Sequence, residues 1–117
     1  SGPGLVDLAR FYGGDPADPA AVTGGDDPAS LAATERFCRL LGARAGDLVL
    51  NFLPTGGLWL CGGIPPRLGD RLEGLGLLER YTAKGRFAQL IGRHPLLLVT
   101  DDRLGLRGAA AAARARL

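Results

Sequence analysis

Residues 57–67 read GLWLCGGIPPR, an apolar run enclosed by glycines and followed by a proline pair. Leu58 to Cys61 is continuously apolar, which is typical of a β-strand buried on both faces. Gly62-Gly63 then predicts a tight turn. Proline is tolerated in the first turn of a helix, because its missing N–H is not needed there. This stretch therefore predicts a strand, a turn and a helix that continues to Gly74.

A second apolar run, Pro95 to Thr100, predicts another buried strand. Residues 105–117 are rich in alanine and predict a last helix, in which Arg114 and Arg116 complement the negative end of the helix dipole. The order strand, helices, strand, helix predicts two parallel strands joined by a right-handed crossover. Two strands are few for an independent sheet, so we expect the sheet to continue outside this chain.

The N-terminal half has mainly helical periodicity. Apolar residues recur at helical spacing from Leu5 to Tyr12, and the glycines at 13 and 14 end that helix. Residues 15–29 are rich in Asp, Pro, Gly and Ala, and predict a surface excursion with room for one helical turn.

A long helix is predicted to begin at Asp27-Pro28, where the carboxylate can accept a free backbone N–H. One face stays apolar as far as Phe52, and the helix stops near Pro54. We expect the glycines at 42 and 46 to loosen it. Residues 77–81 and 84–92 predict two further helical pieces. The whole chain is thus predicted to have an α/β fold with few parallel strands and several helices.

Composition excludes several classes of protein. A chain of 117 residues that is 46% apolar and 22% charged can form the core of one small domain. Its net charge of +2 and scattered arginines are unsuited to a nucleic-acid backbone. No apolar run approaches the roughly 20 residues of a membrane helix. Cys38 and Cys61 are too few for a disulfide framework, so we expect two buried, reduced thiols in a cytoplasmic protein.

The turn at Gly62-Gly63 is the first candidate for a ligand site. Backbone N–H groups at the start of a helix attract anions, and glycine lets a ligand approach without a Cβ in the way. In open parallel sheets, ligands lie just beyond the carboxyl ends of the strands, which is the position of this pair. On pattern alone, a tight turn that uses glycine for its backbone angles is slightly favoured over a ligand site.

The turn after the second predicted strand is another candidate, because it carries Asp101 and Asp102. Adjacent carboxylates on a loop are more often a solvated turn or a helix cap than a metal or acid–base pair. His94 lacks a nearby nucleophile or carboxylate in a recognisable arrangement, which favours a packing or surface role.

Two other features are open to a structural or a functional interpretation. Lys84 and Arg86 could contact phosphate, but a solvated helix start explains them equally well. Trp59 lies inside an apolar run, so core packing is favoured over base stacking.

Residues 57–67 resemble the bacterial glucokinase segment Gly-Val-aromatic-apolar-small-Gly-Gly-Ile-x-Pro-Arg. The likeness extends over nearly the whole chain, in the same order and spacing. It includes residues 1–6 (SGPGLV), 37–50, 84–87 (KGRF), 105–106 and 108–109, whereas Arg107 stands where the family usually has an apolar residue. Several agreeing motifs make this resemblance far more specific than one glycine pair.

The resemblance implies an incomplete lobe of the actin-like ATPase (ribonuclease H-like) fold, with residues 1–117 as a single-domain, C-terminal, nucleotide-side portion of a glucokinase. Gly62 and Gly63 would form the adenosine motif, and Ile64 and Arg67 would line or support the same wall. The family transfers the γ-phosphoryl group of ATP, with magnesium, to the 6-hydroxyl of glucose.

Other family motifs do not occur in this chain. They are the Asp-x-Gly-Gly-Thr phosphate loop, the Asn-Asp pair that supplies the base, and the Glu and His residues that hold the sugar. We therefore expect no turnover by this chain alone. Its expected partner is a missing kinase lobe or a second copy of itself. A non-catalytic remnant or interaction module of the sugar-kinase fold is the alternative, while the absence of a DNA-binding segment disfavours a sugar-responsive repressor.

Overall fold

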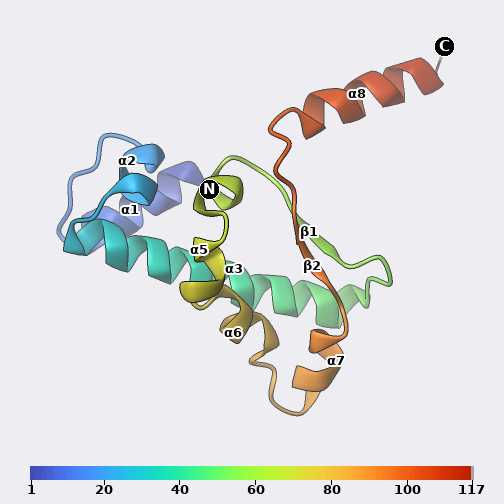
Figure 1. The fold of residues 1–117 in the computed structure, drawn as a ribbon, viewed down its shortest axis with the longest axis horizontal. Coiled ribbons are helices and arrows are strands. Elements are labelled where there is room, and N and C mark those ends of the chain that lie inside the picture. Colours follow the sequence, from blue (N-terminus) through green and yellow to red (C-terminus); the bar gives the residue numbers. More distant parts are fainter. Residues whose placement is uncertain (117) are drawn as a thin grey trace.

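The computed structural model describes residues 1–116, and most of its elements are helices (Figure 1). In chain order the elements are α1 (Gly2–Phe11), α2 (Pro19–Gly24), α3 (Pro28–Phe52), β1 (Leu58–Leu60), α4 (Ile64–Leu68), α5 (Arg71–Gly74), α6 (Leu77–Thr82), the 3₁₀ helix η1 (Gly85–Phe87), α7 (Ala88–Gly92), β2 (Leu96–Leu98) and α8 (Leu104–Ala115).

The two strands form a parallel pair, as predicted. Leu58 is in register with Leu96 and Leu60 with Leu98. The prediction that both faces are buried is wrong. Alternate side chains of a strand point to opposite faces, and Leu58 and Leu60 pack toward the helices, whereas Trp59 is 60% exposed. The helices therefore cover one face of this sheet and leave the face of Trp59 open.

Helix α3 is the long element against which most other helices pack. Asp27 caps it by accepting the N–H of Ser30 at 3.0 Å, as the sequence predicts. The helix is continuous through Gly42 and Gly46, so the expected loosening does not occur. Instead these glycines let α6 approach closely. A Cβ at Gly42 would lie 2.9 Å from the carbonyl carbon of Leu77 and closer still to its oxygen.

Lys84 strengthens the same helix crossing. Its Nζ donates to the carbonyl oxygen of Ala43 at 2.9 Å and forms an ion pair with Asp47. Only 14% of the Lys84 side chain is exposed. Lys84 is therefore neither a solvated residue at a helix start nor free for phosphate, because its ammonium group holds the α6–η1 connection to α3.

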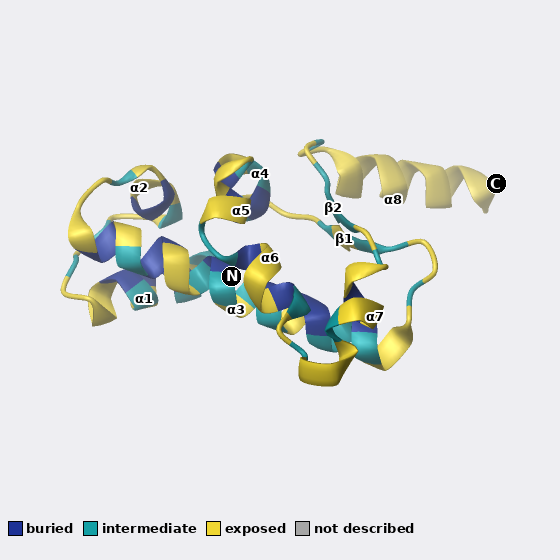
Figure 2. Ribbon diagram, turned by 60° about the horizontal axis from the view of Figure 1, so that its bottom comes forward, coloured by how far each residue is buried: buried dark blue, intermediate teal, exposed yellow. Residues whose placement is uncertain are grey.

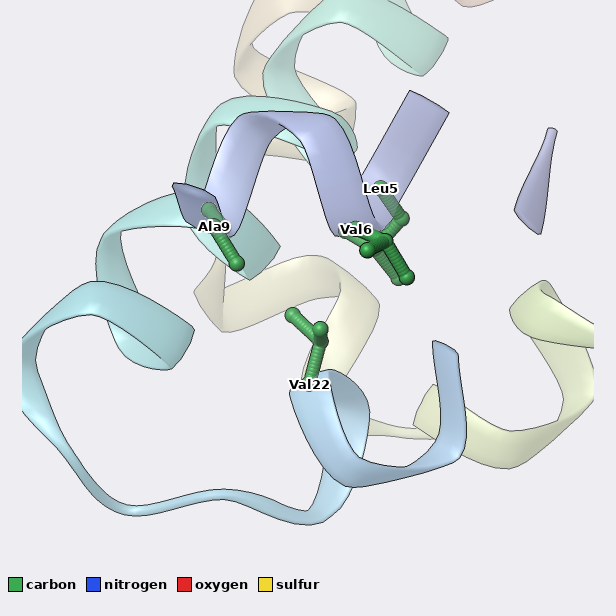
Figure 3. Packing of buried hydrophobic residues seen from close by; sticks show 5 residues of the cluster. Leu5, Val6, Ala9 and Val22 are labelled. Carbon is green, nitrogen blue, oxygen red and sulfur yellow. The ribbon is translucent and has the colours of Figure 1, made fainter. Parts of the chain in front are cut away.

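Helix α2 lies in the stretch predicted as a surface excursion, and that prediction is wrong in part. Figure 3 shows Val22 of α2 directed toward Leu5, Val6 and Ala9 of α1. Val22 is completely buried. The stretch between α1 and α3 therefore contributes to the core. A single valine gives no periodic pattern of apolar residues, so the sequence did not predict this burial.

The segment after β1 was predicted as one helix and is broken into α4 and α5. The break is at Gly69, whose φ of +49° lies in the left-handed region that favours glycine. After the break, α5 turns back toward α2, where Nη1 of Arg71 donates to the carbonyl oxygen of Thr23 at 2.9 Å.

The last helix, α8, extends away from the other elements (Figure 1). Its prediction is confirmed through Ala115, while Leu117 lies outside the described residues. Every residue of α8 is exposed (Figure 2). The radius of gyration is 16.0 Å, against about 13 Å for a compact chain of this length. No helix within residues 1–116 has the length and apolar character needed to span a bilayer.

Candidate functional site

The Gly62-Gly63 turn follows β1 and leaves its backbone uncovered. Gly62 has a φ of +117°, which side chains other than hydrogen rarely tolerate, whereas Gly63 has an ordinary right-handed φ of −86°. A Cβ built at either position would meet no atom within 4 Å. The turn therefore needs glycine for its conformation at Gly62 only, and at Gly63 the missing side chain leaves open space.

The open space belongs to a cavity of about 630 Å³. All four residues that the sequence predicts for the site line it, namely Gly62, Gly63, Ile64 and Arg67. The other lining residues were not predicted and come from α1, the start of α2 and one face of α3, with Cys61 and Pro65 beside the turn. They are Ser1, Gly2, Asp18, Pro19, Ala20, Phe37, Leu41, Cys61 and Pro65.

The residues that line this first cavity differ in polarity. Phe37 and Leu41 are four residues apart on α3, so they lie on one side of that helix and provide an apolar wall. Arg67 is exposed and makes no ion pair within residues 1–116. The cavity thus combines an apolar wall, a bare main-chain turn and one available guanidinium group.

A second cavity of about 370 Å³ borders the same turn. It is lined by Gly62 and Gly63 together with Asp101 and Asp102. The structure therefore brings together the two turns that the sequence singled out separately. They meet because each follows one strand of a parallel pair.

Asp101 has structural partners in this second cavity. It accepts the backbone N–H of Arg103 at 2.9 Å and Nη1 of Arg107 at 2.9 Å. These bonds, with the Arg103 N–H first, hold the pKa of the Asp101 carboxyl below its ordinary value. Asp102 is almost fully exposed. The pair thus forms a turn before α8, and residues 1–116 contain no cluster of three side chains suited to a metal ion.

The two cysteines differ in their environments. Cys38 is completely buried, and this burial raises the pKa of its thiol to about 11. Cys61 is exposed beside Gly62, so the expectation of a second buried thiol is wrong. Strand β1 ends at Leu60, and Cys61 lies beyond it in the turn, where it is exposed to solvent.

Of the remaining candidates, His94 has a packing role. Its Nδ1 lies 3.1 Å from the carbonyl oxygen of Pro54, and its own carbonyl accepts the hydroxyl of Tyr81 at 2.8 Å. Arg86 is exposed and its guanidinium lies 5.0 Å from the ring centre of Phe87. Neither residue lines the cavities beside Gly62 and Gly63.

Comparison with known proteins identifies the family. The family model for glucokinase matches residues 1–116. The chain belongs to the glucokinase family. Glucokinase from Stenotrophomonas maltophilia (strain K279a) is 40% identical over 119 residues, which is 94% of this chain and 36% of that protein. Glucokinase from Xanthomonas oryzae pv. oryzae (strain MAFF 311018) is 39% identical over the same shares of the two chains.

A solved glucokinase has the same arrangement of elements. The crystal structure of glucokinase from an Antarctic psychrotroph superposes with a TM-score of 0.81 at 37% identity, covering 96% of this chain and 38% of that one. The chain therefore corresponds to a little over a third of the length of these glucokinases. Its structure is mostly helical with two parallel strands, and it matches part of a glucokinase.

Proposed function

We propose that this chain is the C-terminal, nucleotide-side portion of a glucokinase that transfers the γ-phosphoryl group of Mg-ATP to the 6-hydroxyl of glucose. Residues 1–117 would supply the adenosine wall as one part of an actin-like ATPase lobe. One observation carries the proposal: Gly62, Gly63, Ile64 and Arg67 line a single cavity at the carboxyl end of a parallel strand, in a chain of the glucokinase family.

The shape and chemistry of the first cavity support a nucleoside as its ligand. A purine base binds against apolar side chains, and Phe37, Leu41 and Ile64 are among the residues that line the cavity. The absence of a side chain at Gly63 allows a ribose or α-phosphate to approach the main chain. Arg67 is the only Lys or Arg among the lining residues, and its guanidinium suits a phosphate oxygen.

Magnesium does not fit the residues of this chain taken alone. Mg²⁺ prefers several oxygen ligands in octahedral geometry. Within residues 1–116 no three carboxylate, His or Cys side chains gather for a metal, and Asp101 is already bonded to Arg103 and Arg107. Any magnesium that accompanies ATP would therefore depend on the remainder of the enzyme.

A non-catalytic interaction module is the second candidate function, and the exposed apolar surface supports it. Leu106 of α8 is 71% exposed and Trp59 is 60% exposed. Such side chains suit contact with further protein. A kinase lobe encoded in the same reading frame would support the enzyme, whereas a gene product limited to this chain would support the module.

Replacement of Gly63 by valine tests the nucleotide assignment. Because the φ of Gly63 is ordinary and a Cβ there meets nothing, valine should fold without strain while filling the space beside the turn. We expect ADP binding, measured by calorimetry, to weaken at least about tenfold, or about 1.4 kcal/mol. Gly74→Val is the matched control, since Gly74 also faces open space but lines neither cavity beside the turn. Unchanged affinity in Gly63→Val would remove the assignment.

A further inference from the structure

Asp18 is a carboxylate held in one orientation at the edge of the first cavity. It caps α2, because its Oδ1 accepts the N–H of Ala21 at 2.8 Å. Pro19 follows directly and fixes the backbone at the start of the helix. The second oxygen, Oδ2, accepts no hydrogen bond from any residue between 1 and 116. One oxygen thus anchors the side chain while the other keeps its full capacity to accept.

Charge is distributed unevenly around this cavity. Asp18 is the only Asp or Glu among its lining residues, and Arg67 is the only Lys or Arg. Asp18 belongs to the α2 wall and Arg67 to the α4 wall. Neither forms an ion pair within the described residues. The lining of this cavity therefore combines one carboxylate and one guanidinium group with the apolar side chains of Phe37 and Leu41.

We propose that Asp18 binds the ribose of a nucleotide in this cavity. Its Oδ2 accepts hydrogen bonds from the 2′- and 3′-hydroxyls, which are donors that a carboxylate binds well. The same negative charge disfavours a phosphate at the α2 wall, so the phosphates extend toward Arg67. Asp18 is thereby a specificity-determining residue that sets both sugar preference and ligand direction. This inference rests on the nucleotide function proposed above.

The test compares two ligands in two variants of this chain. ADP and 2′,3′-dideoxy-ADP differ only in the hydroxyls that Asp18 is proposed to bind. Asp18→Asn preserves the cap, since asparagine is an equally good capping residue. Its single oxygen is used by Ala21, so the atom free to face the ligand becomes an N–H donor. Asp27→Asn is the matched control, because Asp27 caps α3 in the same way and does not line the first cavity.

We expect the unaltered chain and Asp27→Asn to bind ADP on the order of tenfold more tightly than the dideoxy ligand, as for a charge-assisted hydrogen bond. In Asp18→Asn the ratio should fall to below about threefold. A ratio near one in the unaltered chain, or an unchanged ratio in Asp18→Asn, overturns the role of Asp18. If ADP still binds in those cases and is lost in Gly63→Val, the proposed function stands without it. Failure of the unaltered chain to bind ADP counts against both proposals.

Discussion

The close crossing of α3 and α6 should make Gly42 intolerant of even one added methyl group. Alanine normally stabilises a helix interior by roughly 1 kcal/mol relative to glycine. Here the new Cβ would lie 2.9 Å from the carbonyl carbon of Leu77 and closer still to its oxygen. Because both are backbone atoms, the clash can be relieved only if the backbone of α6 shifts away from α3. Overpacking of this kind costs about 1–3 kcal/mol, and more when no side chain can yield. We expect Gly42→Ala to lower the free energy of unfolding by about 2 kcal/mol overall.

Urea denaturation followed by circular dichroism measures this change, and a loss of about 2 kcal/mol corresponds to roughly 10 °C in melting temperature. Gly108→Ala in α8 is the control, because a Cβ there meets nothing within 4 Å. Its stability should be unchanged or higher. If Gly42→Ala were as stable as the unaltered chain, the close approach of α6 to α3 would be refuted.

Two further predictions concern titratable side chains. A thiol reagent at neutral pH should label Cys61 in the folded chain and Cys38 only after unfolding, because burial raises the pKa of the Cys38 thiol to about 11; mass spectrometry showing rapid double labelling of folded protein would contradict this. The Ser30 hydroxyl, and then its backbone N–H, hold the pKa of Asp27 below its ordinary value. The stabilisation from Asp27 is therefore complete above the unfolded pKa of about 4 and is lost as pH falls through the lowered folded value. Asp27→Asn, which caps without titrating, should lose less stability than the unaltered chain between pH 6 and pH 2 in urea titrations; equal losses would be evidence against this role.

The sequence predicted an element well where the residues that determine it lie close together in the chain. Asp27-Pro28 marks a helix start because the capping carboxylate and its N–H partner lie only three residues apart. The parallel strands followed from two apolar runs separated by helices. Burial was predicted less well, because it depends on what covers each face. Trp59 lies in an apolar run, yet it is exposed since the helices pack on the opposite face.

The glycines show the same limit. Glycine has a low intrinsic helix propensity, and we therefore expected Gly42 and Gly46 to loosen α3. Whether a neighbouring helix uses the missing side chain is a tertiary property, and it decided the role of Gly42 and Gly46. At Gly69 the outcome is the reverse. The spacing of apolar residues predicted one continuous helix, but Gly69 adopts a φ of +49° and the helix is interrupted there.

At the candidate site, the sequence could indicate only the wall that a contiguous motif encodes. Gly62 to Arg67 are close in the chain, so their pattern was visible. The rest of the lining includes Asp18 at the start of α2 and Phe37 and Leu41 on α3, which reach the cavity only after folding. A capping aspartate followed by proline indicated a helix start at Asp27, and the same pattern at Asp18 was available as a signal for α2.

The proposed function depends on contact between a nucleotide and the bare main chain at Gly62-Gly63. At 12.1 kDa the chain is suited to amide NMR, which reports each N–H separately. On titration with ADP we expect the largest shifts at Gly62 and Gly63, with smaller shifts at Arg67 and Ala20 across the first cavity. Shifts confined to other surfaces, or none at millimolar ADP, would contradict the account.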